Sequence, residues 1–135
     1  MKGILADVQM IGDVEHLVMA MQRQPWVEFW DHLGLVLYHF ADFGLTPTSA
    51  DLEIWLLCQA EQLILITDNR NSDSVDSLGA AIRSHNTSSS LPVLTIGKLA
   101  RFQKNKAYAE RVLDRLFGYL FDIDRVRGAG RLYLP

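Results

Sequence analysis

Short apolar runs recur along the chain, and their length favours strands over helices. They cover residues 4–8, 35–40, 63–67 and 91–96. The third run is apolar at every position up to Thr67, without the alternation of a half-buried strand. Such a run is typical of a strand covered on both faces, as in a parallel sheet flanked by helices.

Between these runs, large apolar residues return at steps of three and four, the period of an amphipathic helix. The pattern predicts a first helix capped by Asp13 and a second that holds Pro25 in its first turn and ends at Gly34. The unbroken apolar stripe over residues 109–120 predicts the clearest helix of the chain.

Two further helices are expected in the middle of the chain. One covers about residues 50–60 with Thr48 or Ser49 as its cap, and its nearly continuous apolar content predicts burial on more than one side. The other carries Leu78 and Ile82, together with Ala81, on one face.

The alternation of strands and helices predicts an α/β fold, a three-layer α/β/α sandwich around a mainly parallel four- or five-stranded sheet. We expect one domain over residues 1–135, with its core at about 3–121. Residues 122–135 lack a helical period. Within them, residues 132–134 predict either an edge strand or a segment docked on a partner.

Right-handed crossovers favour the strand order 2-1-3-4, which reverses direction between the first and third strands. Ligands of such sheets bind at this reversal, outside the carboxyl ends of the strands. Asp7 and Asp68 end these two strands, so we expect their side chains to converge.

Composition narrows the class of protein. The single cysteine, Cys58, excludes an intrachain disulfide and indicates a reducing compartment, so a cytoplasmic location is expected. No apolar run approaches the roughly 20 residues of a membrane helix. A dinucleotide fingerprint is also absent, so neither a membrane nor a dinucleotide cofactor is expected.

The formal net charge of −3 hides a split along the chain. Residues 1–97 hold twelve acids and four bases, giving −8, whereas residues 98–135 hold nine bases and four acids, giving +5. Such asymmetry indicates an anionic partner or an acidic metal pocket.

The acids near the expected strand ends suit a hard cation such as Mg²⁺ or Mn²⁺, which prefers oxygen ligands. Asp51 and Glu53 begin a helix, and Asp73 follows Asp68 closely. With Asn69 and Asn71 nearby, the cluster suits metal-assisted phosphodiester hydrolysis. The structural alternative is that several of these acids only cap helices.

Two basic groups follow the fourth strand. Lys98 and Arg101 belong to the first, with Phe102 or Tyr108 available to stack on a base. Arg125, Arg127 and Arg131 form the second. These groups either contact a phosphate backbone, form a solvated face or pair with the acidic surface of a second subunit.

Three motifs resemble the PIN-like (PilT N-terminus) nuclease superfamily, in particular its short branch. They are Leu5-Ala6-Asp7, the helix start Asp51-Leu52-Glu53-Ile54, and the strand-closing Thr67 followed by Asp68-Asn69-Arg70-Asn71. The resemblance covers about residues 3–97. It implies an α/β/α sandwich with a Mg²⁺- or Mn²⁺-dependent ribonuclease site.

The resemblance also assigns roles by position. The first acid of the family maps to Asp7, and the acids at its helix start map to Asp51 or Glu53. Its last acid usually stands two residues after the closing Thr, where this chain has Asn69, with Asn71 in place of a second frequent acid. Asp68 or Asp73 is then the source of the missing charge.

The leading hypothesis is therefore a metal-dependent ribonuclease or a degenerate RNA-binding form of one. The alternatives are a non-enzymatic homodimeric interaction module and, more weakly, a phosphoacceptor or phosphohydrolase. The predicted catalytic residues are Asp7, Asp51, Asp68 and Asp73; the predicted metal ligands are Asp7, Asp51, Glu53 and Asp68; and the predicted substrate contacts are Asn69, Arg70, Asn71, Lys98 and Arg101.

Overall fold

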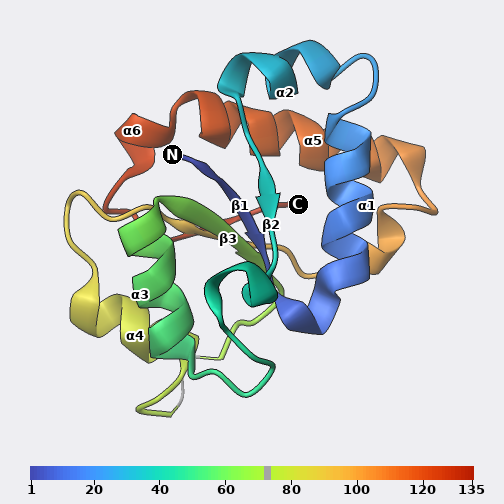
Figure 1. Cartoon of the computed structure of the whole chain (residues 1–135). Helices are drawn as coiled ribbons and strands as arrows, with labels where there is room; N and C mark the ends of the chain where they lie inside the picture. The colour runs from blue at the N-terminus through green and yellow to red at the C-terminus, as the bar shows by residue number, and fades with distance from the viewer. Residues whose placement is uncertain (72–73) are drawn as a thin grey trace.

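The computed structural model describes residues 1–71 and 74–135 and contains one sheet of five parallel strands (Figure 1). The sheet order is β2-β1-β3-β4-β5, so the expected order of the first four strands is confirmed. The strands are β1 (Gly3–Ala6), β2 (Leu37–Tyr38), β3 (Leu63–Thr67), β4 (Val93–Thr95) and β5 (Arg131–Tyr133).

Helices cover both faces of the sheet and make the predicted three layers (Figure 1). One face carries α1 (Ile11–Met21), α2 (Val27–Leu33) and α5 (Lys106–Phe121), and the other carries α3 (Asp51–Glu61) and α4 (Leu78–His85). The remaining short elements are the 3-10 turns η1 (Val8–Met10), η2 (Phe40–Phe43) and η3 (Leu99–Arg101) and the single turn α6 (Ile123–Val126).

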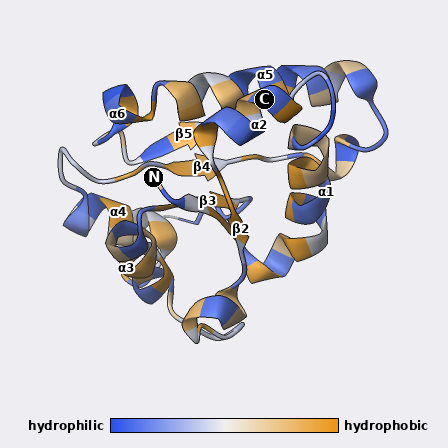
Figure 2. Cartoon of the chain, turned by 45° about the horizontal axis from the view of Figure 1, so that its top comes forward, coloured by the Kyte–Doolittle hydropathy of each residue, from blue (hydrophilic) through white to orange (hydrophobic). Residues whose placement is uncertain are grey.

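The alternation of side chains along the strands divides the core into two clusters. In β3, Ile64 and Ile66 face the cluster shared with α1, α2 and α5, whereas Leu63 and Leu65 face α3 and α4. Figure 2 shows the strands largely orange between helices whose polar residues face outward. Two covered faces explain why β3 is apolar at every position up to Thr67.

The edge strand β5 settles one open alternative and corrects one prediction. Residues Arg131–Tyr133 pair in parallel with Val93–Thr95, so the end of the chain is an edge strand of its own sheet. The prediction that residues 122–135 contain no helix was wrong, because α6 forms one turn before β5.

Three predictions about helix ends were also wrong. Asp13 lies inside the first turn of α1, because η1 runs directly into the helix at Ile11. Pro25 precedes α2, which starts at Val27. Ala50, rather than Thr48 or Ser49, is the N-cap residue of α3; the Ser49 hydroxyl instead accepts the amide hydrogen of Thr46.

The prediction that α3 is buried on more than one side was wrong as well. Ile54, Trp55 and Cys58 are buried, but Leu56 on the opposite side is 46% exposed. Only one face of the helix therefore packs on the sheet. Across the described residues, no helix is long and apolar enough to cross a membrane.

Candidate active site

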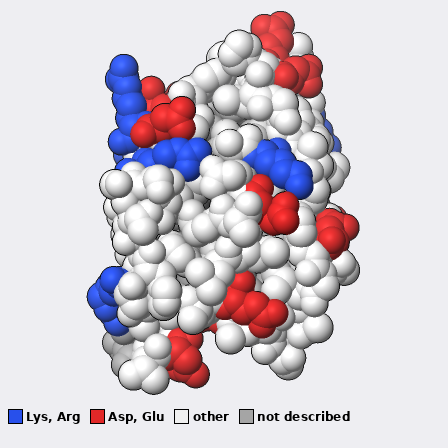
Figure 3. Space-filling view, turned by 60° about the vertical axis from the view of Figure 1, so that its left-hand side comes forward, with Lys and Arg blue, Asp and Glu red and all other residues white. Residues whose placement is uncertain are grey.

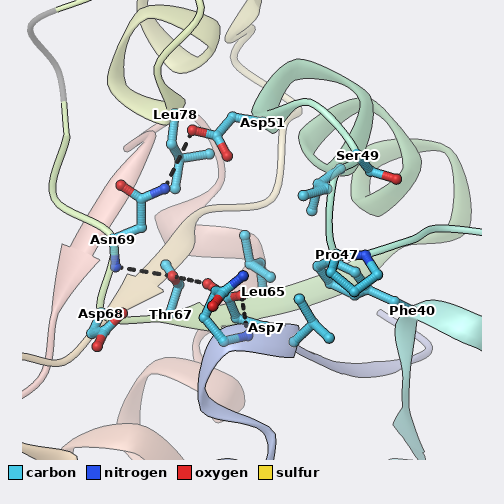
Figure 4. A pocket seen from close by; sticks show the side chains of 13 residues that line it. Asp7, Phe40, Pro47, Ser49, Asp51, Leu65, Thr67, Asp68, Asn69 and Leu78 are labelled. Carbon is cyan, nitrogen blue, oxygen red and sulfur yellow. Dashed lines mark hydrogen bonds between the residues drawn. The ribbon is translucent and has the colours of Figure 1, made fainter.

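A cavity of about 320 Å³ opens at the carboxyl ends of β1 and β3, where the strand order reverses (Figure 4). Asp7 and Asp68 border it from the two strand ends, as the sequence predicted, and Asp51 borders it from the start of α3. Thr67 and Asn69 complete its polar wall. We call this site the acidic cavity.

Asp7 is held at both of its carboxylate oxygens. Its Oδ1 accepts the amide hydrogen of Gln9 at 3.0 Å and so caps η1, and its Oδ2 accepts the hydroxyl hydrogen of Thr67 at 2.6 Å. The Thr67 side chain is fully buried. The capping role and the site role thus belong to the same residue, and the two hydrogen bonds fix the carboxylate in one orientation.

The hydrogen-bonded chain continues from Thr67 to Asp51 (Figure 4). The Thr67 hydroxyl accepts the amide hydrogen of Asn69 at 3.0 Å, and Asn69 Nδ2 donates to Asp51 Oδ2 at 3.3 Å. Asp51 Oδ1 has no hydrogen-bond donor among the described residues. Asn69 therefore spans the distance between two carboxylates that do not contact each other.

Asp68 borders the cavity in a different way. Its side chain is exposed, its amide lies 3.0 Å from the sulfur of Met10, and in Figure 4 its carboxylate points away from those of Asp7 and Asp51. Asp73 lies outside the described residues. Among those that are described, no three acidic, histidine or cysteine side chains come close enough together to hold a metal ion.

The donor set at the cavity is nevertheless compatible with a hard cation. Mg²⁺ is commonly bound through one or two carboxylates, with water and substrate phosphate in the other positions. Asp7 and Asp51 supply two carboxylates on one cavity, and Asp51 Oδ1 remains available. Because two hydrogen bonds fix the Asp7 carboxylate, it could bind a cation without changing its orientation.

The other predicted metal ligand and substrate contacts lie outside the acidic cavity. Glu53 is exposed on α3, and Asn71 follows the cavity wall without lining it. Lys98 precedes η3 and Arg101 ends it, and Leu99 and Phe102 of the same segment pack into the cluster with α1 and α5. This packing turns the segment toward the opposite face of the sheet.

Arg131, from the second basic group, lies beside the acidic cavity, a position that the sequence did not indicate. It reaches from β5 and donates through Nη1 to the carbonyl oxygen of Asn69 at 2.6 Å and to the hydroxyl of Thr95 at 2.8 Å. Burial lowers the pKa of Arg131, nearby Arg70 lowers it further, and Asp51 opposes the change. The sequence placed Arg131 in a basic group, but its position beside Asn69 depends on the pairing of β5 with β4.

Several residues that were expected to contact nucleic acid are instead used within the fold. Arg127 donates to Asp124, to the carbonyl of Ser89 and to Gln62, so its guanidinium serves the fold. Phe102 and Tyr108 are buried and offer no ring to a base. Figure 3 shows acidic and basic groups interspersed with uncharged surface, so the charge split along the chain does not divide this side of the molecule.

Cys58 is not a nucleophile. It is 2% exposed in α3, and burial raises the pKa of its thiol to about 12. Thiolate, the reactive form, is therefore scarce near neutral pH.

Comparison of the chain with family models, with curated proteins and with solved structures finds no match. What the site can do therefore follows from its own geometry and chemistry.

Proposed function

We propose that this protein hydrolyses phosphodiester bonds of RNA with the help of Mg²⁺ or Mn²⁺, using the acidic cavity as its active site. The observation that carries the proposal is the convergence of Asp7, Asp51 and Asn69 on one cavity at the reversal of strand order. The choice of RNA comes from the resemblance to PIN-like nucleases. The choice of a hard cation comes from the oxygen-rich wall.

Asp7 and Asp51 would hold the ion, and a bound ion would polarise a phosphoryl oxygen and activate water. Thr67 and Asn69 would position these two carboxylates. Thr67 keeps Asp7 in a single orientation, and Asn69 holds one oxygen of Asp51 while leaving the other toward the cavity. Such fixed ligands need little rearrangement to receive a cation.

The direct test is cleavage of a labelled single-stranded RNA by the full chain with Mn²⁺, Mg²⁺ or EDTA. We expect cleavage with either ion, none in EDTA and none above background for Asp7→Asn. Asp31→Asn is the matched control, because Asp31 is an exposed acid on α2, across the sheet from the acidic cavity. Equal cleavage by wild type and Asp7→Asn would refute the proposed active site.

A degenerate RNA-binding form is the second candidate. It is favoured by Asn69, which stands where the resembled family usually has an acid and leaves the cavity with less negative charge. RNA binding without cleavage by the wild type, with either ion present, would select it. The homodimeric alternative predicts a mass of two chains in light scattering at low and high salt, and a monomer at both would reject it.

A further inference from the structure

A second pocket lies behind Asn69, between α4 and the edge strand β5. It has a volume of about 310 Å³ and is lined by Arg70, Arg83, Arg131 and Tyr133, among others. Arg70 comes from the segment after β3, Arg83 from α4, and the other two from alternate positions of β5. We call this site the arginine pocket.

Arg70 and Arg131 bring two positive charges to this pocket. Neither Arg70 nor Arg131 forms a salt bridge with an acid among the described residues. Arg131 uses Nη1 for Asn69 and Thr95, and its other N–H groups have no partner in the described part of the chain. Two guanidinium groups that share a concave site are suited to bind an anion, and phosphate matches their planar fork.

Two backbone amides at the start of α4 already have partners within the protein. At the start of α4, the amide of Gly79 donates to the carbonyl of Asn71, and that of Ala80 donates to the hydroxyl of Ser77. An anion in the arginine pocket would therefore be recognised by guanidinium groups.

Tyr133 adds an aromatic surface at the same place. Its side chain is 53% exposed, and the guanidinium carbon of Arg70 lies 5.4 Å from the centre of its ring. Exposed rings beside arginines are the usual platform on which bases of single-stranded nucleic acids stack. The pocket thus pairs a phosphate contact with a stacking surface.

We infer that the arginine pocket binds a nucleotide unit of single-stranded RNA, with its phosphate between Arg70 and Arg131 and its base on Tyr133. That the nucleic acid is RNA rests on the proposed function; that the pocket takes a phosphate does not. Asn69 connects the two sites, because its side chain meets Asp51 while its carbonyl oxygen meets Arg131. A chain held in the arginine pocket would then run past the acidic cavity.

The test is calorimetric titration of the full chain with the RNA hexamer rA6 in EDTA. We expect binding by wild type and a loss of affinity of about tenfold or more in Arg70→Gln, because charged hydrogen bonds to phosphate are removed. Arg111→Gln is the control: Arg111 is also exposed beside a tyrosine ring, but lies on α5 across the sheet. An equal effect of both variants, or no binding by wild type, would overturn the inference.

Substitutions at Tyr133 and Gly97 test the proposed pose without removing a positive charge. Tyr133→Leu should weaken rA6 binding about fivefold or more, whereas Tyr133→Phe should stay within about twofold because the ring remains. In Gly97→Ala, a Cβ would lie 2.6 Å from Nη2 of Arg70 and displace this flexible side chain without removing its charge. We expect it to weaken binding with an unchanged melting temperature; full affinity in both Tyr133→Leu and Gly97→Ala would contradict the assigned pose.

Two more titrations show whether the pocket binds a terminal or an internal phosphate, and whether this binding depends on the acidic cavity. A 5′-phosphorylated hexamer that binds more tightly than the 5′-hydroxyl hexamer assigns the terminal phosphate, and equal affinity assigns an internal one. Asp7→Asn should bind rA6 in EDTA as well as wild type does. Absence of cleavage together with Arg70-dependent binding would thus reject the nuclease and keep the arginine pocket.

Discussion

The acidic cavity and the arginine pocket are connected through Asn69, which lines the first and hydrogen-bonds to Arg131 of the second, and their side chains have opposite charges. On one side of Asn69, Asp7 and Asp51 present carboxylates that are tied by hydrogen bonds through Thr67 and the Asn69 amide. On the other side, Arg70 and Arg131 present cations with no paired acid in the described residues. Carboxylates and guanidinium groups therefore line separate sites, which lie on opposite sides of Asn69.

The acidic cavity and the arginine pocket also differ in how strongly their side chains are held in place. The acidic cavity is formed by strand ends and a helix start, where Asp7 and Asp51 each accept a hydrogen bond from a neighbouring side chain. The arginine pocket lies at an edge strand, and Arg70 is an exposed side chain whose guanidinium lies over the ring of Tyr133. Substitutions in the cavity should therefore affect catalysis more than substitutions in the pocket.

The largest expected effect is that of Asp51→Asn on RNA cleavage. Removing one of two charged ligands should lower the Mn²⁺-dependent rate by about 100-fold or more while leaving rA6 binding in EDTA unchanged. Glu53→Gln is the matched control, since it removes an acid from the same helical turn but outside the cavity. If the two variants cleave equally well, the cavity has no special role.

A smaller effect of opposite sign is expected for Asn69→Asp. A third anionic group beside Asp51 should raise Mn²⁺ affinity about tenfold, because affinity in oxygen sites follows ligand charge. In EDTA the same variant should melt at a lower temperature than wild type, because the two carboxylates repel. Asn71→Asp, outside the cavity, should change neither quantity; unchanged or weaker Mn²⁺ binding by Asn69→Asp would speak against a metal at this place.

The smallest expected effect is that of Thr67→Val. The buried hydroxyl that donates to Asp7 and accepts from Asn69 would be lost, leaving the amide of Asn69 without its partner. We expect a loss of about 1–2 kcal/mol in the free energy of unfolding and a several-fold weaker Mn²⁺ affinity. Denaturant unfolding and calorimetry measure the two effects, and Thr67→Ser, which keeps the hydroxyl, should show much less of each.

The fold and half of the acidic cavity could be predicted because they follow from local pattern and a general rule. Apolar runs fixed the strands, and the reversal of strand order placed Asp7 beside the end of β3. The start of a helix placed Asp51 at the same edge. The orientation of Asp68 away from these acids could not be predicted, since it depends on the backbone turn after Thr67.

The basic residues were harder to place because their positions depend on tertiary packing. Lys98 and Arg101 follow β4 in sequence, but burial of Leu99 and Phe102 carries them to the other face. Arg131 reaches Asn69 only because β5 pairs with β4. This pairing joins segments that are distant in sequence, so a local pattern does not predict it. The predicted cap of α3 was wrong for a related reason: the Ser49 hydroxyl accepts a hydrogen bond from Thr46 within its own loop.

The most direct test of the account is calorimetric titration of Mn²⁺ into wild type and into Asp7→Asn. Asn keeps the size of the side chain and an oxygen for the amide of Gln9, so the comparison isolates the charge at the cavity. We predict that wild type binds one Mn²⁺ per chain and that Asp7→Asn binds it at least about tenfold more weakly. A wild-type protein that takes up no Mn²⁺, or a variant that binds it equally well, would contradict the account.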